Sequence, residues 1–234
     1  MNNLQQYSDL AASWWDESSP FKDLLYLNVP RFRFFDKYVS SWDGKVVLDL
    51  GCGGGFVSEE LARRGAHVVG LDPSLALIEV AQKHAVMNNL RIDYNVGFGE
   101  SLPYADCLFD VVVCVDVLEH VSDLDKVLNE VHRVLKPGGL FLFDTINKTL
   151  FSFLWMIVVL EWIVARIPRG THDWRKFLPP RILNDKLQKV GFNLLETVGI
   201  VMQSFSFSKG KIVPRFREST SQKSGLYAGV AVRL

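Results

Sequence analysis

The sequence predicts an α/β fold built around a doubly wound, mostly parallel sheet. Short, largely apolar runs alternate along the chain with segments of helical periodicity, as expected when strands buried on both faces are joined by helices. The first of these runs leads directly into a glycine-rich stretch, VLDLGCGGGF at residues 47–56. With 234 residues, of which 48% are hydrophobic, the chain is expected to form one domain, residues 1–234, with an ample core.

Each element of this fold is predicted from its own stretch of sequence. N-terminal helices are expected within residues 13–39, where helical periodicity follows a Ser-Ser-Pro break. Strands are predicted from apolar runs at residues 45–50, 67–72, 91–97, 109–116 and 140–146, and the sheet is expected to finish at residues 193–201 and 225–234. Helices are predicted between the strands at residues 56–65, 73–89 and 122–139. Acids early and Lys136 late in the third of these helices match the helix dipole.

Composition excludes some classes of function. The net charge is +0 and no long basic block occurs, so nucleic acid is not expected as a partner. The three cysteines are odd in number and lack the spacing of a metal site, which favours reduced thiols in a cytoplasmic protein. The N-terminus has no basic region followed by an apolar one, so no signal peptide is predicted.

The glycine-rich stretch predicts a ligand site at the carboxyl end of the first strand. In doubly wound sheets, ligands bind outside the carboxyl ends of the strands. Gly51, Gly53 and Gly55 allow close approach to the backbone there. Asp72 ends the second strand, 21 residues after Gly51, which is the spacing of a carboxylate that accepts hydrogen bonds from ribose hydroxyls.

The details of the loop favour S-adenosylmethionine (SAM) over a dinucleotide. A dinucleotide fingerprint requires a third small residue for close helix packing, and Phe56 occupies that position. The pattern Gly-x-Gly-x-Gly preceded by Asp49 instead suits SAM, which has no phosphate and presents hydroxyls and an ammonium group to acids. An NAD-linked oxidoreductase and a glycine turn with a purely structural role are the alternatives.

Beyond these patterns, the chain resembles class I SAM-dependent methyltransferases, and more narrowly the ubiquinone-biosynthesis O-methyltransferases. The resemblance covers about residues 14–180 and is carried by WWDESSPFKDLLYLNVPRFR, DLGCGGGFVSEELARRGAHVVGLD, CVDVLEHV, TINK and IPRGTHDWRKFLPP. It implies a seven-stranded sheet with an antiparallel last strand. Within the domain, residues 1–42 are expected to form an N-terminal helical cap and residues 148–180 an apolar helical insertion or lid. The resemblance also implies methyl transfer from SAM to a ring hydroxyl of a lipophilic, polyprenyl phenol or catechol, a quinone precursor.

The resemblance assigns cofactor roles to particular residues. It implies that Arg31 lies at the cofactor, that Gly51 belongs to the loop around it and that Asp72 binds the ribose. Val115, where the family usually has Met, is expected to line the adenine side. Asp116 replaces the family's Glu in the motif CVDVLEHV.

The same motif supplies candidates for catalysis. A catechol hydroxyl has a pKa near that of Tyr, about 10, so a base or a metal should assist its deprotonation. Asp116, Glu119 and His120 would share one face if the segment is helical, and could then bind Mg²⁺ or Zn²⁺. Without metal, Glu119 or His120 becomes the base. His172 is a further catalytic candidate, with a loop-fixing hydrogen bond as its alternative role.

The apolar stretch at residues 150–168 approaches the length of a membrane span. A span is not predicted, because Glu161 interrupts it and the chain must return to complete the sheet. The stretch is expected to be either a buried lid or a helix resting at the membrane surface, with Lys148, Arg166 and Arg169 near the head groups.

Together these features predict a cytoplasmic SAM-dependent O-methyltransferase that contacts the membrane peripherally. A methyltransferase acting on another small molecule, and a SAM-binding protein without catalysis, are the alternatives.

Overall fold

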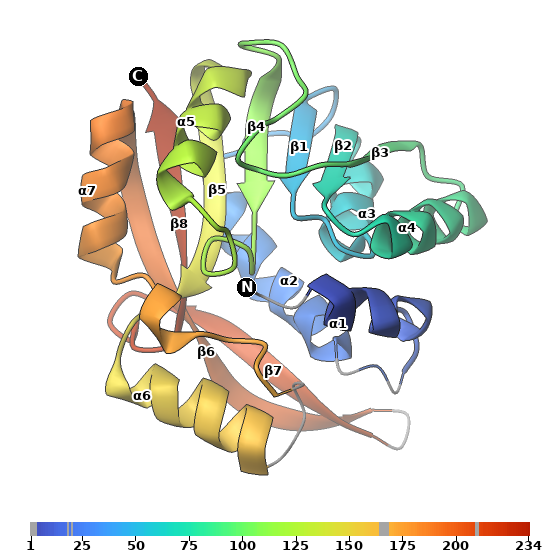
Figure 1. The fold of residues 1–234 in the computed structure, drawn as a ribbon, viewed down its shortest axis with the longest axis vertical. Coiled ribbons are helices and arrows are strands. Elements are labelled where there is room, and N and C mark those ends of the chain that lie inside the picture. Colours follow the sequence, from blue (N-terminus) through green and yellow to red (C-terminus); the bar gives the residue numbers. More distant parts are fainter. Residues whose placement is uncertain (1–3, 18, 20, 164–168, 209–210) are drawn as a thin grey trace.

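An eight-stranded sheet forms the centre of the molecule (Figure 1). The computed structural model describes residues 4–17, 19, 21–163, 169–208 and 211–234. The strands lie in the order β3-β2-β1-β4-β5-β8-β6-β7. Their bounds are β1 Val46–Leu50, β2 His67–Asp72, β3 Ile92–Val96, β4 Phe109–Cys114, β5 Leu135–Ile146, β6 Phe192–Ser208, β7 Lys211–Ser219 and β8 Leu226–Arg233.

The sheet is parallel in its first half and antiparallel at its far end. β1 pairs in parallel with β2 and β4, and β4 pairs in parallel with β5. β8 runs antiparallel to both β5 and β6, which confirms the antiparallel direction predicted for the last strand. The doubly wound, mostly parallel α/β class is likewise confirmed.

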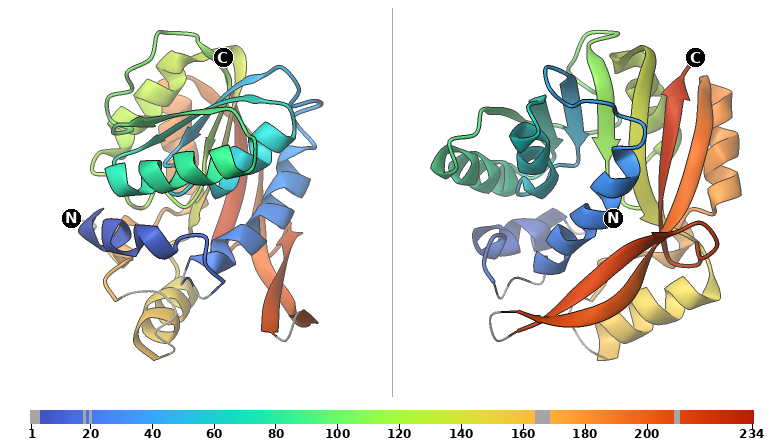
Figure 2. Two further views of the ribbon diagram at one scale, coloured as in Figure 1. Left: turned by 90° about the vertical axis from the view of Figure 1, so that its right-hand side faces the viewer. Right: turned by 180° about the vertical axis from the view of Figure 1, so that it is seen from behind.

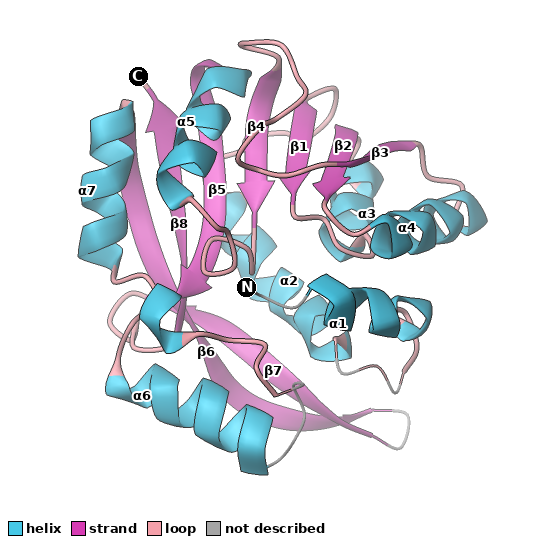
Figure 3. Cartoon of the chain, in the orientation of Figure 1, coloured by secondary structure: helices cyan, strands magenta, loops and turns pink. Residues whose placement is uncertain are grey.

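The predicted number of strands, seven, is wrong because β7 adds an eighth. β6 does not stop near Val201 but continues to Ser208, and pairs with β7 as an antiparallel hairpin. The alternation of Ser204, Phe205 and Ser206 has the period of a strand. Pro214 is accommodated because β7 is an edge strand. In Figures 1 and 3 this hairpin extends past the carboxyl ends of the parallel strands.

Helices cover both faces of the sheet, as Figure 2 shows from two further sides. Their bounds are α1 Leu4–Leu10, α2 Lys22–Phe35, α3 Phe56–Arg63, α4 Leu75–Met87, α5 Leu124–Val134, α6 Leu150–Ser152 and α7 Pro180–Val190, with 3-10 turns η1 Ala11–Ser13 and η3 Trp174–Lys176 and a π-helical segment η2 Phe153–Ile163 that continues α6. On one face, α5 and α7 bury Leu128 and Leu187 against Leu48. On the other, α2 and α3 bury Phe35 and Leu61.

The helix predicted at residues 122–139 is shorter in the structure. α5 begins after Asp123, whose side chain accepts a hydrogen bond from Lys126 N, and ends at Val134. The chain turns directly into β5 at Leu135, which pairs with Phe109. The Pro-Gly-Gly segment therefore lies within the start of β5 rather than at the end of the helix. The register between β4 and β5 shifts in this part of the strand.

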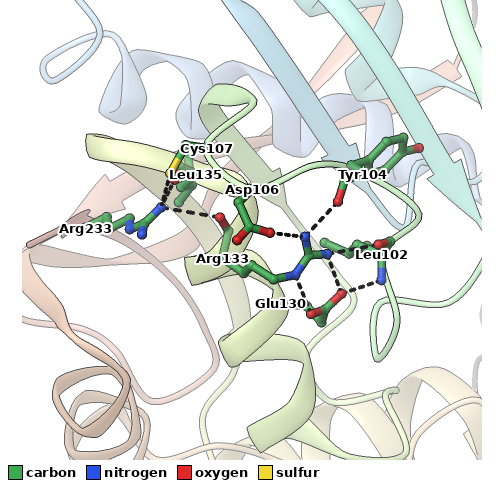
Figure 4. Close-up of polar contacts among 8 residues, drawn as sticks. All are labelled: Leu102, Tyr104, Asp106, Cys107, Glu130, Arg133, Leu135 and Arg233. Carbon is green, nitrogen blue, oxygen red and sulfur yellow. Dashed lines mark hydrogen bonds and ion pairs between the residues drawn. The ribbon is translucent and has the colours of Figure 1, made fainter.

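Arg133, on α5, fastens the long connection between β3 and β4 (Figure 4). Its Nη1 donates to Tyr104 O at 2.7 Å and its Nη2 donates to Leu102 O at 3.0 Å. The same guanidinium pairs with Glu130 and Asp106. The connection between Gly97 and Leu108 is thereby held against α5 through backbone carbonyls as well as through surface charges.

We expect Arg133→Met to lower the free energy of unfolding by about 1–3 kcal/mol. The exposed ion pairs contribute little, but two carbonyls lose a charged donor. Urea denaturation of the two proteins measures the difference. Lys126→Met removes an exposed pair with Asp123 on the same helix and should change stability by less than about 0.5 kcal/mol. Equal effects of the two substitutions would contradict this role for Arg133.

Candidate functional site

A large cavity of about 1670 Å³ lies at the carboxyl ends of the parallel strands. Its volume exceeds the roughly 300–1,000 Å³ of most ligand pockets. N-terminal helices, α6 with η2, and the β6–β7 hairpin surround this end of the sheet in Figure 1. The cavity is lined by most of the predicted site residues, namely Arg31, Asp49, Gly51, Gly53, Asp72, Val115, Asp116, Glu119, His120 and His172.

The glycine loop brings bare backbone to the cavity wall. Gly51 and Gly53 have φ values of 75° and 53°, which favour glycine over any other residue. A Cβ on Gly51 would lie 2.2 Å from Val117 Cγ2, so the loop and the segment after β4 approach each other closely. Gly55, with φ 96°, is the N-cap of α3 and packs against the Tyr94 hydroxyl rather than lining the cavity.

Asp72, the last residue of β2, is hydrogen-bonded to the backbone of the glycine loop. Its Oδ2 accepts from Gly53 N at 3.0 Å and its Oδ1 accepts from Ser74 N at 2.9 Å. Burial raises the pKa of Asp72 to about 6, although these two backbone donors counteract the rise. Each carboxylate oxygen can accept a further hydrogen bond, so the side chain is arranged to bind a pair of hydroxyls.

Asp49 lies deeper, at the end of β1. Its Oδ2 accepts from Ser58 Oγ at 2.5 Å, and burial raises the pKa of Asp49 to about 7. The carboxyl group is therefore fixed by α3 while still facing the cavity.

Arg31, on α2, lies between two carboxylates. Its Nε donates to Asp144 Oδ2 at 2.5 Å and its Nη2 donates to Asp116. Burial alone would lower the pKa of Arg31, but the charges of Asp116 and Asp144 raise it, so the guanidinium stays charged. Asp144 also accepts from Asp116 N at 2.7 Å. Arg31 thus joins α2, β5 and the loop after β4 at the cavity.

The prediction that Asp116, Glu119 and His120 share a helix face is wrong. Residues 115–123 form a loop, and α5 begins only at Leu124. Asp116 has a φ of 56°, which a right-handed helix does not contain. Among the described residues, no group of three or more His, Cys, Asp or Glu side chains is arranged to hold a metal ion. Binding of Mg²⁺ or Zn²⁺ by Asp116, Glu119 and His120 therefore stays a prediction, without the helical arrangement expected for it.

Glu119 and His120 nevertheless both line the cavity. Glu119 Oε2 accepts from Thr145 Oγ1 at 2.6 Å. Burial, and then the charge of Asp116, raise the pKa of Glu119 to about 7. Burial and the neighbouring His172 lower the pKa of His120 to about 3, so His120 is neutral near pH 7.

His172, in the loop that precedes η3, lies close to Glu119 and His120. Its ring lies beside His120, with 5.5 Å between the ring centroids. Its Nδ1 is 2.8 Å from Oε1 of Glu161 in η2. Residues 119, 120 and 172, which are far apart in the sequence, thus converge on one part of the cavity.

The comparisons with known proteins identify the family. Residues 48–143 match the model of the methyltransferase domain family. Over 201 residues, the chain is 42% identical to the ubiquinone biosynthesis O-methyltransferase of Hahella chejuensis, covering 86% of this chain and 84% of that protein. The chain belongs to the ubiquinone biosynthesis O-methyltransferase family. The Marinobacter nauticus relative of the same name is 40% identical, over 85% of this chain and 84% of its own.

Solved structures share the fold of this methyltransferase. A SAM-dependent methyltransferase from Aquifex aeolicus has a TM-score of 0.62 at 14% identity, covering 87% of this chain and 89% of that chain. One from Methanosarcina mazei has a TM-score of 0.61 at 22% identity, covering 82% and 93%. The protein is a SAM-dependent methyltransferase, and the preference for SAM over NAD drawn from Phe56 is confirmed.

The residues of the methyltransferase fit SAM. The loop offers bare backbone beside Asp72, and Trp14 lies across it, since a Cβ on Gly54 would approach the indole to 2.3 Å. The indole Nε1 of Trp14 is buried against the loop and has no hydrogen-bond partner among the described residues. Trp14 also lines the cavity, so the bare backbone of the loop, Asp72 and Trp14 would together hold the cofactor.

Several residues of the site were not predicted. Trp14 lay in a segment expected only to form a cap, and Asp144 is the one acid in the apolar run LFLFDTI. Glu161 is likewise a lone acid in an apolar helix. A single acid within an otherwise apolar element is the signal that could have indicated Asp144 and Glu161, because a buried carboxylate requires a partner.

Asp72→Asn should weaken SAM binding by about tenfold to a thousandfold. The amide keeps the shape but replaces one of the two charged acceptors with a donor, and hydrogen bonds to charged groups contribute about 1.5–3 kcal/mol each. Calorimetric titration with SAM measures the change. Asp93→Asn, on the neighbouring strand and exposed, serves as the control. Unchanged affinity in the Asp72 variant would contradict its assignment to the ribose.

SAM affinity should also fall as the pH is lowered through about 6. Above this pH Asp72 is ionised and would accept hydrogen bonds from two ribose hydroxyls; below it, protonation would remove one acceptor site. The loss can reach tenfold per pH unit, because each bound SAM then requires the release of one proton. Titrations between pH 5 and 7.5 measure the trend, which should disappear in Asp72→Asn. A dependence that persists in that variant would assign the effect to another group.

Proposed function

We propose that the protein transfers a methyl group from SAM to a ring hydroxyl of a polyprenyl phenol or catechol, a quinone precursor of ubiquinone biosynthesis. The observation that carries this proposal is the continuity of the cavity. The glycine loop, the ionisable side chains of Glu119, His120 and His172, and a long apolar region line the same space. A methyl donor and a lipophilic acceptor can therefore meet without crossing water.

The apolar region has the chemistry of a prenyl tail site. It lies between η2 and the β6–β7 hairpin and is lined by Trp155, Met156, Val159, Leu160, Ile200, Met202, Phe205 and Phe216. Apolar side chains stabilise a hydrocarbon tail in proportion to the area removed from water, about 25 cal/mol per Å². The part of the cavity at Glu119 and His120 carries polar side chains and suits a ring hydroxyl.

The chemistry requires alignment and a base. SAM supplies an electrophilic methyl group on its sulfonium, which passes to the ring oxygen while the oxygen loses its proton. A phenol pKa of about 10 means that a protein group should take that proton. His120 is a weak base because its pKa is lowered to about 3. Glu119, with its pKa raised to about 7, is the stronger base of the two. His172, which also lines the cavity, is a further candidate, and His120 would accept or orient the hydroxyl.

The surface of the apolar helix supports peripheral contact with a membrane on the cytoplasmic side. Trp162 and Ile163 are 58% and 71% exposed, and Phe205 of the hairpin is also exposed. Arg169 lies over the Trp162 ring at 4.7 Å, where it can meet anionic head groups while the aromatic ring meets acyl chains. Arg166, predicted to act with it, lies outside the described residues. In the described ranges, no helix is long and apolar enough to cross a bilayer.

The function is tested with SAM carrying an isotopically labelled methyl group. Incubation with a prenylated catechol should give a labelled methoxy product by mass spectrometry. The analogue in which the hydroxyls are already methoxy groups should remain unlabelled. Absence of label in the catechol would overturn the proposed function, whereas SAM titration shows separately whether the protein was folded and loaded.

If Glu119 takes the proton, Glu119→Gln should lower kcat by about a hundredfold or more, whereas if His172 takes it the loss should be much smaller, and SAM affinity should stay within about twofold in either case. The amide keeps the size of the side chain but cannot take a proton, and general base catalysis contributes roughly 10²–10⁴ in rate. Steady-state rates on the prenylated catechol measure the loss. Glu60→Gln, on the surface of α3, should retain the wild-type rate. Full activity in the Glu119 variant would exclude Glu119 from proton transfer.

Trp162→Glu combined with Ile163→Glu should reduce binding to anionic vesicles, measured by flotation. Two exposed apolar side chains would be replaced by charges that the membrane repels. The double variant Val86→Glu, Met87→Glu is a matched control, because these residues are apolar and at least as exposed but lie on α4. If the wild-type protein does not float with anionic vesicles, the membrane proposal is wrong and the helix is a lid.

A further inference from the structure

Glu161 is an acidic residue buried within an apolar helix, where a carboxylate is energetically unfavourable. Within the described helix Leu150–Ile163 it is the sole charged side chain, and it is 1% exposed. Burying a carboxylate costs several kcal/mol unless charge or hydrogen bonds compensate. The partners of Glu161 therefore indicate what the residue is for.

Both oxygens of Glu161 accept hydrogen bonds from the loop that carries His172. Oε2 accepts from Gly170 N at 2.8 Å, and Oε1 accepts from His172 N at 3.0 Å. Backbone N–H groups can only donate, so these contacts hold both oxygens of the side chain as acceptors. Oε1 also lies 2.8 Å from His172 Nδ1.

This arrangement determines the tautomer of His172. Facing an acceptor that is already fixed by backbone donors, Nδ1 must carry the proton. In the neutral ring, the lone pair is then on Nε2. The ring lines the cavity beside His120 and packs against Phe177, with 5.9 Å between the latter pair of centroids. An imidazole held in this tautomer is prepared to accept a proton at Nε2.

We propose that Glu161 is a positioning residue that holds His172 in the Nδ1–H tautomer, so that His172 Nε2 takes the proton of the acceptor hydroxyl. This deepens, and rests on, the methyl transfer proposed above. The O–H bond breaks as N–H forms at Nε2, and O–CH₃ forms as S–CH₃ breaks, leaving S-adenosylhomocysteine. The imidazolium formed on His172 is stabilised by the Glu161 carboxylate, which does not itself become protonated.

A purely structural role for Glu161 makes a different prediction. If the carboxylate served only to fasten residues 170–172 to the helix, its replacement would lower stability and leave the rate of folded enzyme unchanged. Glu161→Gln separates the two roles, because its amide oxygen can still accept from the backbone. The amide nitrogen can, however, donate to Nδ1 and so favour the opposite tautomer of His172.

The rate measurement is a double-mutant cycle on the full-length protein with the prenylated catechol. Glu161→Gln should lower kcat by about 10²- to 10⁴-fold, as for a misassigned imidazole tautomer, with the Kd for SAM within about twofold. In the His172→Gln background, Glu161→Gln should cause no further loss, because it acts through His172. Glu161→Asp, which keeps the charge, should recover part of the rate. Full kcat in Glu161→Gln, or additive losses in the cycle, would overturn the proposal.

The tautomer itself is measured by ¹⁵N NMR of the histidine side chains. In the wild-type protein, His172 should show a protonated Nδ1 and an unprotonated Nε2, and in Glu161→Gln the protonated nitrogen should shift toward Nε2. A wild-type ring protonated at Nε2 would overturn the proposal without any variant. Correct tautomer with no methyl transfer by wild-type protein would instead overturn the proposed function, so the two failures are distinguishable.

Discussion

The site depends on one buried guanidinium. Arg31 reaches from the N-terminal region to Asp144 on β5 and to Asp116 in the loop after β4. Without the positive charge, two carboxylates would face each other in a medium of low dielectric constant, where repulsion is strong. With it, the loop of Asp116 is held in a left-handed conformation that Asp, unlike β-branched residues, tolerates. The positions of Glu119 and His120 follow from that conformation.

Site features formed by residues close together in the chain were predicted from the sequence, whereas contacts between residues far apart in the chain were not. The glycine loop and Asp72 were predicted because a strand, a turn and the next strand fix them within about twenty residues. The partners of Arg31 and His172 were not predicted, since Arg31 and Asp144 are 113 positions apart. The expectation of a helical Asp116–His120 face failed for a related reason. A hydrogen bond from the backbone of Asp116 to Asp144 overrides the helical tendency of the segment.

The part of the cavity proposed to hold the methyl acceptor is formed by segments outside the parallel strands. The parallel strands provide the loop and Asp72, as in any class I methyltransferase fold. The N-terminal helices, the apolar helix and the β6–β7 hairpin then enclose the space beyond them. The hairpin was not predicted because the seven-stranded expectation left residues 202–224 without an element. Specificity for the acceptor is therefore expected to reside in these three segments rather than in the sheet.

The carboxylate of Glu161 connects the exposed surface of the apolar helix to the imidazole of His172 in the cavity. The helix that presents Trp162 and Ile163 to the outside also carries the acceptor that holds His172. A displacement of this helix changes the geometry of the imidazole, and a change at the imidazole acts back on the helix. Thermodynamic linkage makes such coupling reciprocal. A surface or partner that contacts the helix would thus also act on the imidazole of His172, with the side chain of Glu161 as the connection.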